Sequence, residues 1–145
     1  MTAFANDRSP DVIVIGGGPA GATASTIIAQ HGHKVQLFER ERFPRFHIGE
    51  SLLPGNVALF DKLGVRDQIE KIGMPKFGIE FVPPDLDYCS YVDFAEGWDP
   101  SMASAWQVRR SEMDELLFRH AASLGAQALE GAKVKDVAFD DEGAR

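Results

Sequence analysis

Cysteine is nearly absent from this sequence of 145 residues, which contains Cys89 alone. A lone cysteine cannot form an internal disulfide, and this favours a reducing compartment and a cytoplasmic protein. Cys89 has no adjacent histidine and no CxxC partner, so we interpret it as a small apolar residue within a strand. His31 and His33 have no third ligand nearby, and the sequence predicts no metal site.

Long apolar runs and an excess of positive charge are also missing. No run approaches the length of about 18 apolar residues that a membrane-spanning helix needs. The first residues lack the basic and apolar segments of a signal peptide. Lys and Arg number 15 against 22 Asp and Glu, which gives a net charge of −7. This balance argues against a nucleic-acid partner and against an anionic membrane surface.

The residues that are present predict an α/β fold. The composition, with 44% hydrophobic and 26% charged residues, is typical of a soluble globular protein. Residues 11–16 form a short apolar run that predicts a buried strand, 17–32 predict a helix and 34–39 predict the next strand. These segments form one βαβ unit, right-handed by the usual rule.

The middle of the chain predicts a different pattern. Two helices are expected, at Leu53–Leu63 and Asp67–Ile72, each followed by a glycine. The alternation between Phe77 and Phe94, interrupted at Pro83, predicts an antiparallel hairpin, and residues 104–110 predict a further strand. Residues 74–108 are therefore expected to contribute a hairpin and a strand toward the substrate side, and residues 1–145 to be the N-terminal portion of a larger domain.

The last helix and the end of the chain complete the prediction. Residues 111–125 predict a helix in which Ser111 is the N-cap and Asp114 the partner of a capping box. A short strand, a longer strand over Lys133–Phe139 and a turn then follow, with no returning strand. Because folded proteins usually cover such an edge, the sequence is interpreted as the N-terminal part of a longer protein. The alternative is a terminal edge strand with a frayed tail.

A glycine-rich turn stands between the first strand and the first helix. Gly16, Gly18 and Gly21 have the spacing G-x-G-x-x-G, and Glu39 ends the next strand. Gly16 permits the tight turn, Gly18 lets the backbone approach a pyrophosphate, and Gly21 lets the helix pack closely on the strand. The carboxylate of Glu39 can accept hydrogen bonds from a ribose hydroxyl. Together these features predict a dinucleotide site.

The segment "RFPRFHIGESLLPG", residues 42–55, favours FAD over NAD. An NAD dehydrogenase would continue from the second strand into another helix and parallel strand. Here an irregular segment and an antiparallel hairpin follow, which is typical of two-part flavoproteins.

Three segments resemble the flavin-dependent halogenases of the phenol and pyrrole type, namely "DVIVIGGGPAGATAS", "LFERERFPRFHIGESLLPG" and "QVRRSEMDELL". The first segment is shared by the wider group of two-domain flavin monooxygenases, whereas "PRFHIGESLLP" is more specific to the halogenase-like branch. The resemblance implies that FAD is held by Gly16, Gly18, Pro19, Ala20, Gly21, Glu39, Arg40, Arg45, His47, Gly49, Glu50, Ser51 and Arg110. Arg109 competes with Arg110 for its role. The simpler interpretation of His47 and Glu50 is a loop residue and an acid in a helix's first turn.

The resemblance also implies the chemistry. Reduced flavin from a separate flavin reductase, oxygen and a halide ion would produce hypohalous acid, and Lys76 would be the catalytic lysine. The substrate would be an electron-rich aromatic or pyrrole ring, possibly tethered to a carrier protein. The simpler interpretation of Lys76 is a solvated lysine at a strand edge, like Lys62 and Lys71 on nearby helices. The alternatives for the whole protein are a flavin hydroxylase, a geranylgeranyl-reductase-like enzyme, or a truncated FAD-binding module without catalysis.

Overall fold

The computed structural model describes residues 9–85, 87–141 and 143–144. The chain divides into two compact units, residues 1–45 with 114–145 and residues 46–113. The sequence predicted no signal peptide from the first residues of the chain. Residues 1–8 lie outside the described residues, so the structure does not bear on that prediction. Among the described residues, no helix is long and apolar enough to cross a membrane.

The first unit contains a parallel sheet in the order β1-β2-β7. Its main elements are β1 (Val12–Ile15), α1 (Pro19–Gln30), β2 (Val35–Glu39), most of α4 (Arg110–Ser123) and β7 (Gln127–Glu130). Both outer strands pair with β2 in parallel, with Val12 opposite Val35 and Gln36 opposite Gln127. The predicted βαβ unit is confirmed, and a second parallel strand joins it from much later in the sequence.

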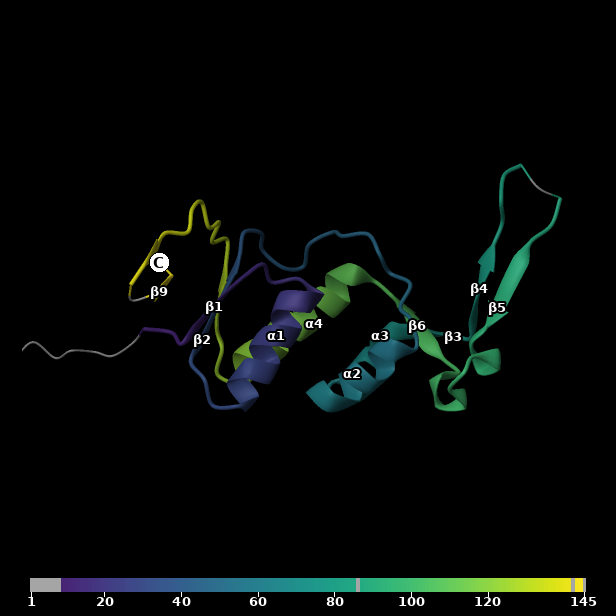
Figure 1. Ribbon diagram of the computed structural model, residues 1–145, viewed down its shortest axis with the longest axis horizontal. Coiled ribbons are helices and arrows are strands. Elements are labelled where there is room, and N and C mark those ends of the chain that lie inside the picture. The colour runs from purple at the N-terminus through teal and green to yellow at the C-terminus, as the bar shows by residue number, and fades with distance from the viewer. Residues whose placement is uncertain (1–8, 86, 142, 145) are drawn as a thin grey trace, which may run out of the picture. The chain divides into compact units, whose positions relative to one another are not determined.

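The core of this unit lies on one face of the sheet, where α1 and α4 run together (Figure 1). Val35 and Leu37 of β2 are buried against Phe118 of α4, and Ile28 of α1 packs on the same cluster. Successive side chains of a strand point to opposite faces. The other face therefore carries Phe38, which is half-buried, and three exposed apolar residues, Ile13, Ile15 and Leu129.

The chain after β7 differs from the prediction. Residues 133–138 form no strand, and a short hairpin follows, made of β8 (Phe139–Asp140) and β9 (Gly143–Ala144). Asp141 lies in the expected turn, and Glu142 lies outside the described residues. The expected lack of a returning strand is wrong, because β9 pairs with β8. The alternation of apolar and polar residues does not by itself predict a strand here, since a strand also needs a partner for its backbone N–H and C=O groups.

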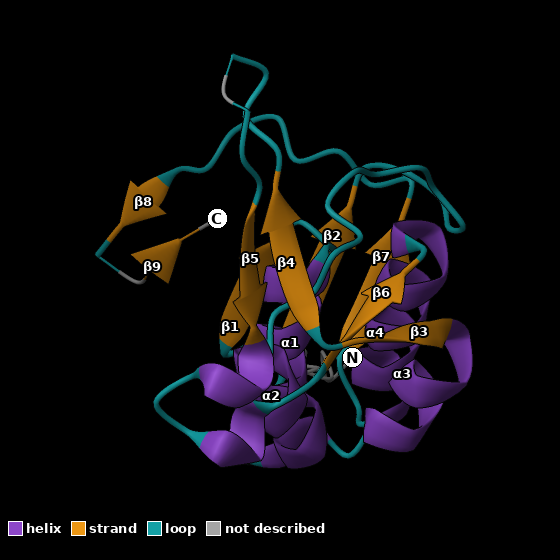
Figure 2. Cartoon of the chain, turned by 90° about the vertical axis from the view of Figure 1, so that its right-hand side faces the viewer, coloured by secondary structure: helices purple, strands orange, loops and turns teal. Residues whose placement is uncertain are grey.

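The second unit combines two helices with two separate antiparallel strand pairs (Figure 2). Its elements are α2 (Gly55–Leu63), α3 (Arg66–Ile72), β3 (Gly73–Lys76), β4 (Gly78–Phe81), β5 (Ser90–Asp93), the 3₁₀ turns η1 (Phe94–Glu96) and η2 (Pro100–Met102), and β6 (Ala105–Val108). The β4–β5 pair is the predicted hairpin, with Ile79 opposite Val92. The core beneath β6 contains Phe60, Ile69 and Trp106, all buried.

Two boundaries in and beside this unit were not predicted. Strand β3, which pairs with β6, contains Gly73 and Pro75, two residue types that are rare inside strands; proline is accepted there because β3 is an edge strand. Helix α4 begins at Arg110, and the N–H groups of Glu112 and Met113 donate to the Arg109 carbonyl. Ser111 is therefore inside the first turn, and the predicted capping box is wrong.

Candidate functional site

The glycine turn between β1 and α1 has the geometry predicted for two of its glycines. Gly16 has φ +103°, a conformation that L side chains rarely adopt. A Cβ on Gly21 would collide with the Gly16 carbonyl oxygen and lie 3.3 Å from Val14 Cγ1. The tight turn at Gly16 and the close packing of helix on strand at Gly21 are thus confirmed as structural features.

Helix α1 begins without a side-chain cap. Gly18 is its N-cap, Pro19 is its first residue, and no acidic residue lies in its first turn. The N–H groups of Ala20 and Gly21 are therefore not accepted by a capping side chain. Free backbone N–H groups and the positive end of the helix dipole make such a terminus suited to phosphate.

Glu39, at the end of β2, is 5% exposed and bonds directly to the turn. Its Oε2 accepts the Gly17 N–H at 2.8 Å, and its Oε1 accepts the Glu41 N–H at 3.0 Å. Burial raises the pKa of Glu39, but these backbone N–H groups and the positive charge of Arg45 outweigh burial, so that the pKa is lowered overall. An ionised carboxylate thus stands beside the glycine turn.

Two arginines of the predicted set lie near Glu39 but differ in environment. The side chain of Arg40 is 69% exposed and reaches Glu41 at 3.6 Å. The side chain of Arg45 is only 10% exposed and forms an ion pair with Asp114, with Nη1 3.1 Å from Oδ2. Its Nη2 lies 3.5 Å from where a Cβ on Gly18 would stand. Arg45 therefore belongs to the turn, whereas Arg40 points to solvent.

In the second unit, the segment with His47, Gly49, Glu50 and Ser51 is exposed but anchored to β6. The Glu50 carbonyl accepts the Val108 N–H at 2.9 Å, and Ser51 forms an antiparallel bridge with Gln107. The segment thus runs as an irregular strand along β6. His47 Nδ1 lies 2.9 Å from the Ile48 carbonyl oxygen. Extended backbone with exposed polar side chains is what a segment needs in order to contact a cofactor.

Arg110 contacts this segment, whereas the Arg109 side chain pairs with Glu112. The Arg110 Nη1 donates to the Ile48 carbonyl at 2.7 Å and to the Gly49 carbonyl at 3.5 Å. The Arg109 side chain is 79% exposed and pairs with Glu112 at 3.1 Å. Of the two candidates, Arg110 is the one that the fold joins to the predicted cofactor segment.

Lys76 is the last residue of β3, and its side chain contacts the end of the same segment. Its Nζ donates to the Ser51 hydroxyl oxygen at 2.6 Å and to the Leu52 carbonyl at 3.1 Å. The same Nζ lies 5.1 Å from the centre of the Phe94 ring. Lys76 is half-buried, and both of these hydrogen bonds restrict its amine.

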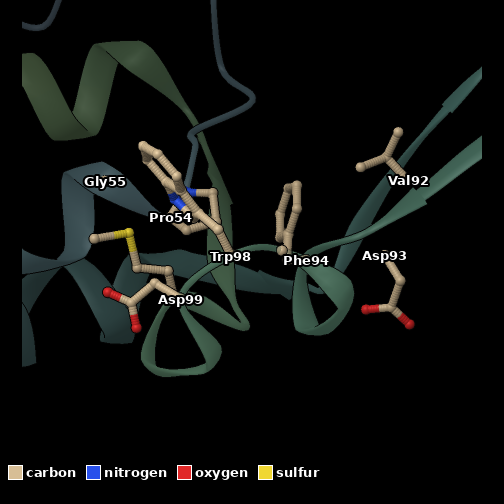
Figure 3. Close-up of a pocket in the computed structure, with 9 residues that line it drawn as sticks. Pro54, Gly55, Val92, Asp93, Phe94, Trp98 and Asp99 are labelled. Atoms are coloured by element: carbon tan, nitrogen blue, oxygen red, sulfur yellow. The ribbon is translucent and has the colours of Figure 1, made fainter.

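An open apolar pocket of about 230 Å³ lies beside Phe94 in this unit. Figure 3 shows the rings of Pro54, Phe94 and Trp98 at this pocket. Trp98 is 99% exposed, while Phe94 is buried. The two carboxylates nearby, Asp93 and Asp99, accept backbone N–H groups of η1 and η2. The pocket walls are therefore mainly hydrocarbon and aromatic.

Three residues of these sites were missed by sequence reasoning. Gly17 was treated as a spacer, but a Cβ there would lie 2.7 Å from Phe118 Cδ2 and 2.9 Å from Glu39 Cβ. Asp114 was expected to cap a helix, and it is fully buried instead. Phe94 was expected only as the end of a strand. The three consecutive glycines offered a signal for Gly17; no sequence signal pointed to the other two.

Similar proteins support the FAD assignment. Residues 9–145 match the model of a family described as an FAD binding domain. A flavin-dependent halogenase of Armillaria mellea is 42% identical over 140 residues, covering 94% of this chain and 27% of that protein. A 1H-pyrrole-2-carbonyl peptidyl-carrier-protein chlorinase of Pseudomonas fluorescens is 36% identical, covering 92% of this chain and 34% of that protein.

A similar solved structure also comes from an FAD-dependent halogenase. The myxobacterial chondrochloren halogenase, an FAD-dependent halogenase, matches with a TM-score of 0.84 and 38% identity, covering 92% of this chain and 31% of that one. The predicted resemblance and the predicted α/β fold are thereby confirmed. The chain spans about a quarter to a third of the length of these relatives.

Proposed function

This chain belongs to the family of the FAD binding domain, and we propose that it binds FAD for a flavin-dependent halogenation reaction. In the proposed reaction, reduced flavin comes from a separate flavin reductase, and a halide ion and oxygen are consumed. The substrate is an electron-rich aromatic or pyrrole ring, free or tethered to a carrier protein. A relative acts on a pyrrole group carried by a peptidyl carrier protein, which supports the tethered form. The single cysteine supports a cytoplasmic location.

The residues of the first unit fit the adenosine diphosphate part of FAD. The uncapped start of α1, where Pro19 sets the first helical turn, would face the pyrophosphate with the N–H groups of Ala20 and Gly21. Glu39 would accept a hydrogen bond from a ribose hydroxyl. In the second unit, the exposed segment from His47 to Ser51 and the guanidinium of Arg110 would bind the flavin portion.

Bound reduced FAD would supply, together with oxygen, the oxidant that converts a halide ion to hypohalous acid. The proposed task of Lys76 is to direct that acid to the substrate. As an ammonium group its Nζ can donate a hydrogen bond to hypohalous acid and orient it. As a neutral amine it can form a nitrogen–halogen bond and release water, then transfer the halogen to an aromatic carbon and recover the amine when that carbon loses its proton.

The contact between Lys76 and Ser51 is the observation that carries this proposal. Ser51 belongs to the segment assigned to the flavin, and its hydroxyl holds the Lys76 Nζ at 2.6 Å. A second acceptor, the Leu52 carbonyl at 3.1 Å, restricts the amine further. Two acceptors on one short segment give a half-buried amine a defined position, which a group that must orient a small oxidant requires.

The apolar pocket supports an aromatic substrate. Phe94 forms one of its walls and also lies against Lys76, with the Nζ 5.1 Å from the ring centre. Aromatic and aliphatic walls favour a flat ring over a charged molecule, because offset and edge-to-face ring contacts add to the burial of apolar surface.

The proposal is tested with the complete gene product, FAD, a reductase with its nicotinamide donor, oxygen and chloride. A phenol and a pyrrole are supplied as substrates, and products are analysed by mass spectrometry. We expect a product with the chlorine isotope pattern that depends on chloride and FAD. A hydroxylated product without halogen would favour the hydroxylase alternative, and a protein that does not bind FAD would exclude the whole proposal.

A further inference from the structure

A buried arginine joins two buried carboxylates in the first unit. The Arg45 guanidinium lies 3.1 Å from Asp114 through Nη1 and 3.6 Å from Glu39 through Nη2, and its side chain is 10% exposed. The side chain of Asp114 is not exposed at all, and that of Glu39 is 7% exposed. The exposed Glu41 is the fourth charged residue of this cluster, with its Oε2 4.0 Å from the Arg45 Nε. Unpaired buried charges are very unfavourable, so these groups depend on one another.

The two ion pairs of Arg45 have different geometry. The contact with Asp114 lies within hydrogen-bond distance, although Nη1 is not aligned as a hydrogen-bond donor in the part of the chain that the structure describes. The contact with Glu39, at 3.6 Å, is longer than a hydrogen bond. Arg45 therefore acts on Glu39 through its charge and occupies none of the acceptor positions of that carboxylate.

The acceptor positions that remain on Glu39 decide what its carboxylate can still bind. A carboxylate has about four acceptor positions on its two oxygens. The N–H groups of Gly17, Glu41 and Arg40 use up to three of them. An arginine bonded to Glu39 in the usual forked manner would take what remains. Because Asp114 holds the other end of the guanidinium, an acceptor position of Glu39 stays open for a ribose hydroxyl.

We propose that Asp114 is a positioning residue for the adenosine half of FAD. It fixes the Arg45 guanidinium to helix α4, at a distance where its charge lies beside the Glu39 carboxylate without hydrogen-bonding to it. The adjacent Gly18, whose Cβ would stand 3.5 Å from Nη2, places the same guanidinium under the start of α1. The inference rests on the proposed FAD function and concerns only the recognition of the adenosine ribose.

The test measures the affinity of the complete gene product for three probes. FAD is titrated directly, and the affinities for ADP and FMN are measured by their competition with FAD. Asp114→Asn removes the charge and keeps the shape of the side chain. Arg45 is then free to hydrogen-bond Glu39, so we expect the affinities for FAD and ADP to fall about ten-fold. The affinity for FMN, which lacks the adenosine half, should not change. A merely structural role would weaken all three probes together.

A double-mutant cycle shows whether Asp114 acts through Glu39. In a Glu39→Gln background the acceptor is already impaired, so adding Asp114→Asn should lower the FAD affinity by less than two-fold more. Glu115→Gln is the matched control, because Glu115 lies next in the same helix and pairs with Arg119 at the surface. It should leave all three affinities unchanged.

A paired variant covers the case in which Asp114→Asn does not fold. Arg45→Met with Asp114→Asn removes both charges and leaves neither buried charge alone. No arginine is then left to hydrogen-bond Glu39, so this variant should show no selective loss of FAD and ADP relative to FMN. A selective loss of ADP in the paired variant would overturn the inference. So would unchanged ADP affinity or an equal loss for FMN in Asp114→Asn, or additive effects of Asp114→Asn with Glu39→Gln. Wild-type protein that fails to bind FAD would instead overturn the proposed function on which it rests.

Discussion

The Nζ of Lys76 donates a hydrogen bond of 2.6 Å to the Ser51 hydroxyl oxygen, although the two residues are 25 positions apart. Antiparallel pairing makes the contact possible. Strand β6 has β3 on one side, with Lys76 opposite Ala105, and bridges to Ser51 through Gln107 on the other. The lysine proposed for halogen transfer and the segment proposed for the flavin are thus held by one strand.

Replacing Lys76 by alanine should abolish halogenation and preserve the cofactor site. A positioned amine of this kind contributes about 10²–10⁴-fold to a rate, so we expect a loss of that size in the rate of aromatic halogenation. FAD affinity and flavin reoxidation by oxygen should be retained, as measured by fluorescence titration and stopped-flow absorbance. Lys71→Ala, at the end of α3, is the control and should change neither property. Near wild-type halogenation by Lys76→Ala, with the same regioselectivity, would refute the assignment.

Replacing Glu39 by alanine should weaken FAD binding. The change removes an acceptor beside a buried ribose hydroxyl, and an unpaired buried group costs about 1–3 kcal/mol. The dissociation constant for FAD should therefore rise about ten-fold to a hundred-fold, as measured by flavin fluorescence. Glu70→Ala on the exposed side of α3 should leave it unchanged. An unaltered dissociation constant for Glu39→Ala would mean that the carboxylate serves the turn alone.

Replacing Gly17 by alanine should destabilise the first unit. Its Cβ would lie 2.7 Å from Phe118 Cδ2 and 2.9 Å from Glu39 Cβ, both inside ordinary contact distance. Overpacking of this kind costs about 1–3 kcal/mol, which lowers Tm by several degrees in thermal unfolding followed by circular dichroism. Gly55→Ala, where nothing lies within 4 Å and φ is not positive, should not lower Tm. Equal Tm values for the two variants would show that Phe118 moves aside freely.

Replacing Glu130 by glutamine should cost stability at neutral pH but not in acid. The Phe43 N–H, at 2.8 Å, and Arg119, at 2.9 Å, lower the pKa of Glu130 below its usual value of 4.5, although burial opposes them. A folded pKa below the unfolded one stabilises the fold above about pH 4.5 and loses this effect as the pH falls through the folded value.

Urea unfolding of the Glu130→Gln variant across pH 3 to 7 measures this effect. We expect a loss of about 1–2 kcal/mol in the free energy of unfolding at pH 7, which shrinks toward zero near pH 3. The matched variant Glu80→Gln, at an exposed position of β4, should match the wild type throughout. A difference for Glu130→Gln that is the same at pH 3 and pH 7 would contradict the role of its charge.

The sequence by itself determined the local parts of this protein. The turn at Gly16, the helix that follows, the strand that ends at Glu39 and the β4–β5 hairpin all follow from short-range rules. Glycine can adopt a positive φ, proline starts helices, and apolar periodicity separates strand from helix. Where these rules conflicted with tertiary pairing, as at Pro75 in β3, the prediction failed. Resemblance to a family supplied the role proposed for Lys76, which no local rule predicts.

Only the tertiary structure decided which of these parts meet. Asp114 looked like the partner of a helix cap in the sequence, yet α4 begins two residues too early for that, and the packing of α4 on β2 turns its carboxylate inward to Arg45. Arg110 was separated from Arg109 by the direction in which each side chain leaves the start of α4. Contacts of this kind join residues far apart in the chain, and they form because burying apolar faces and pairing buried charges lowers the free energy of the whole fold, which no short window of sequence encodes.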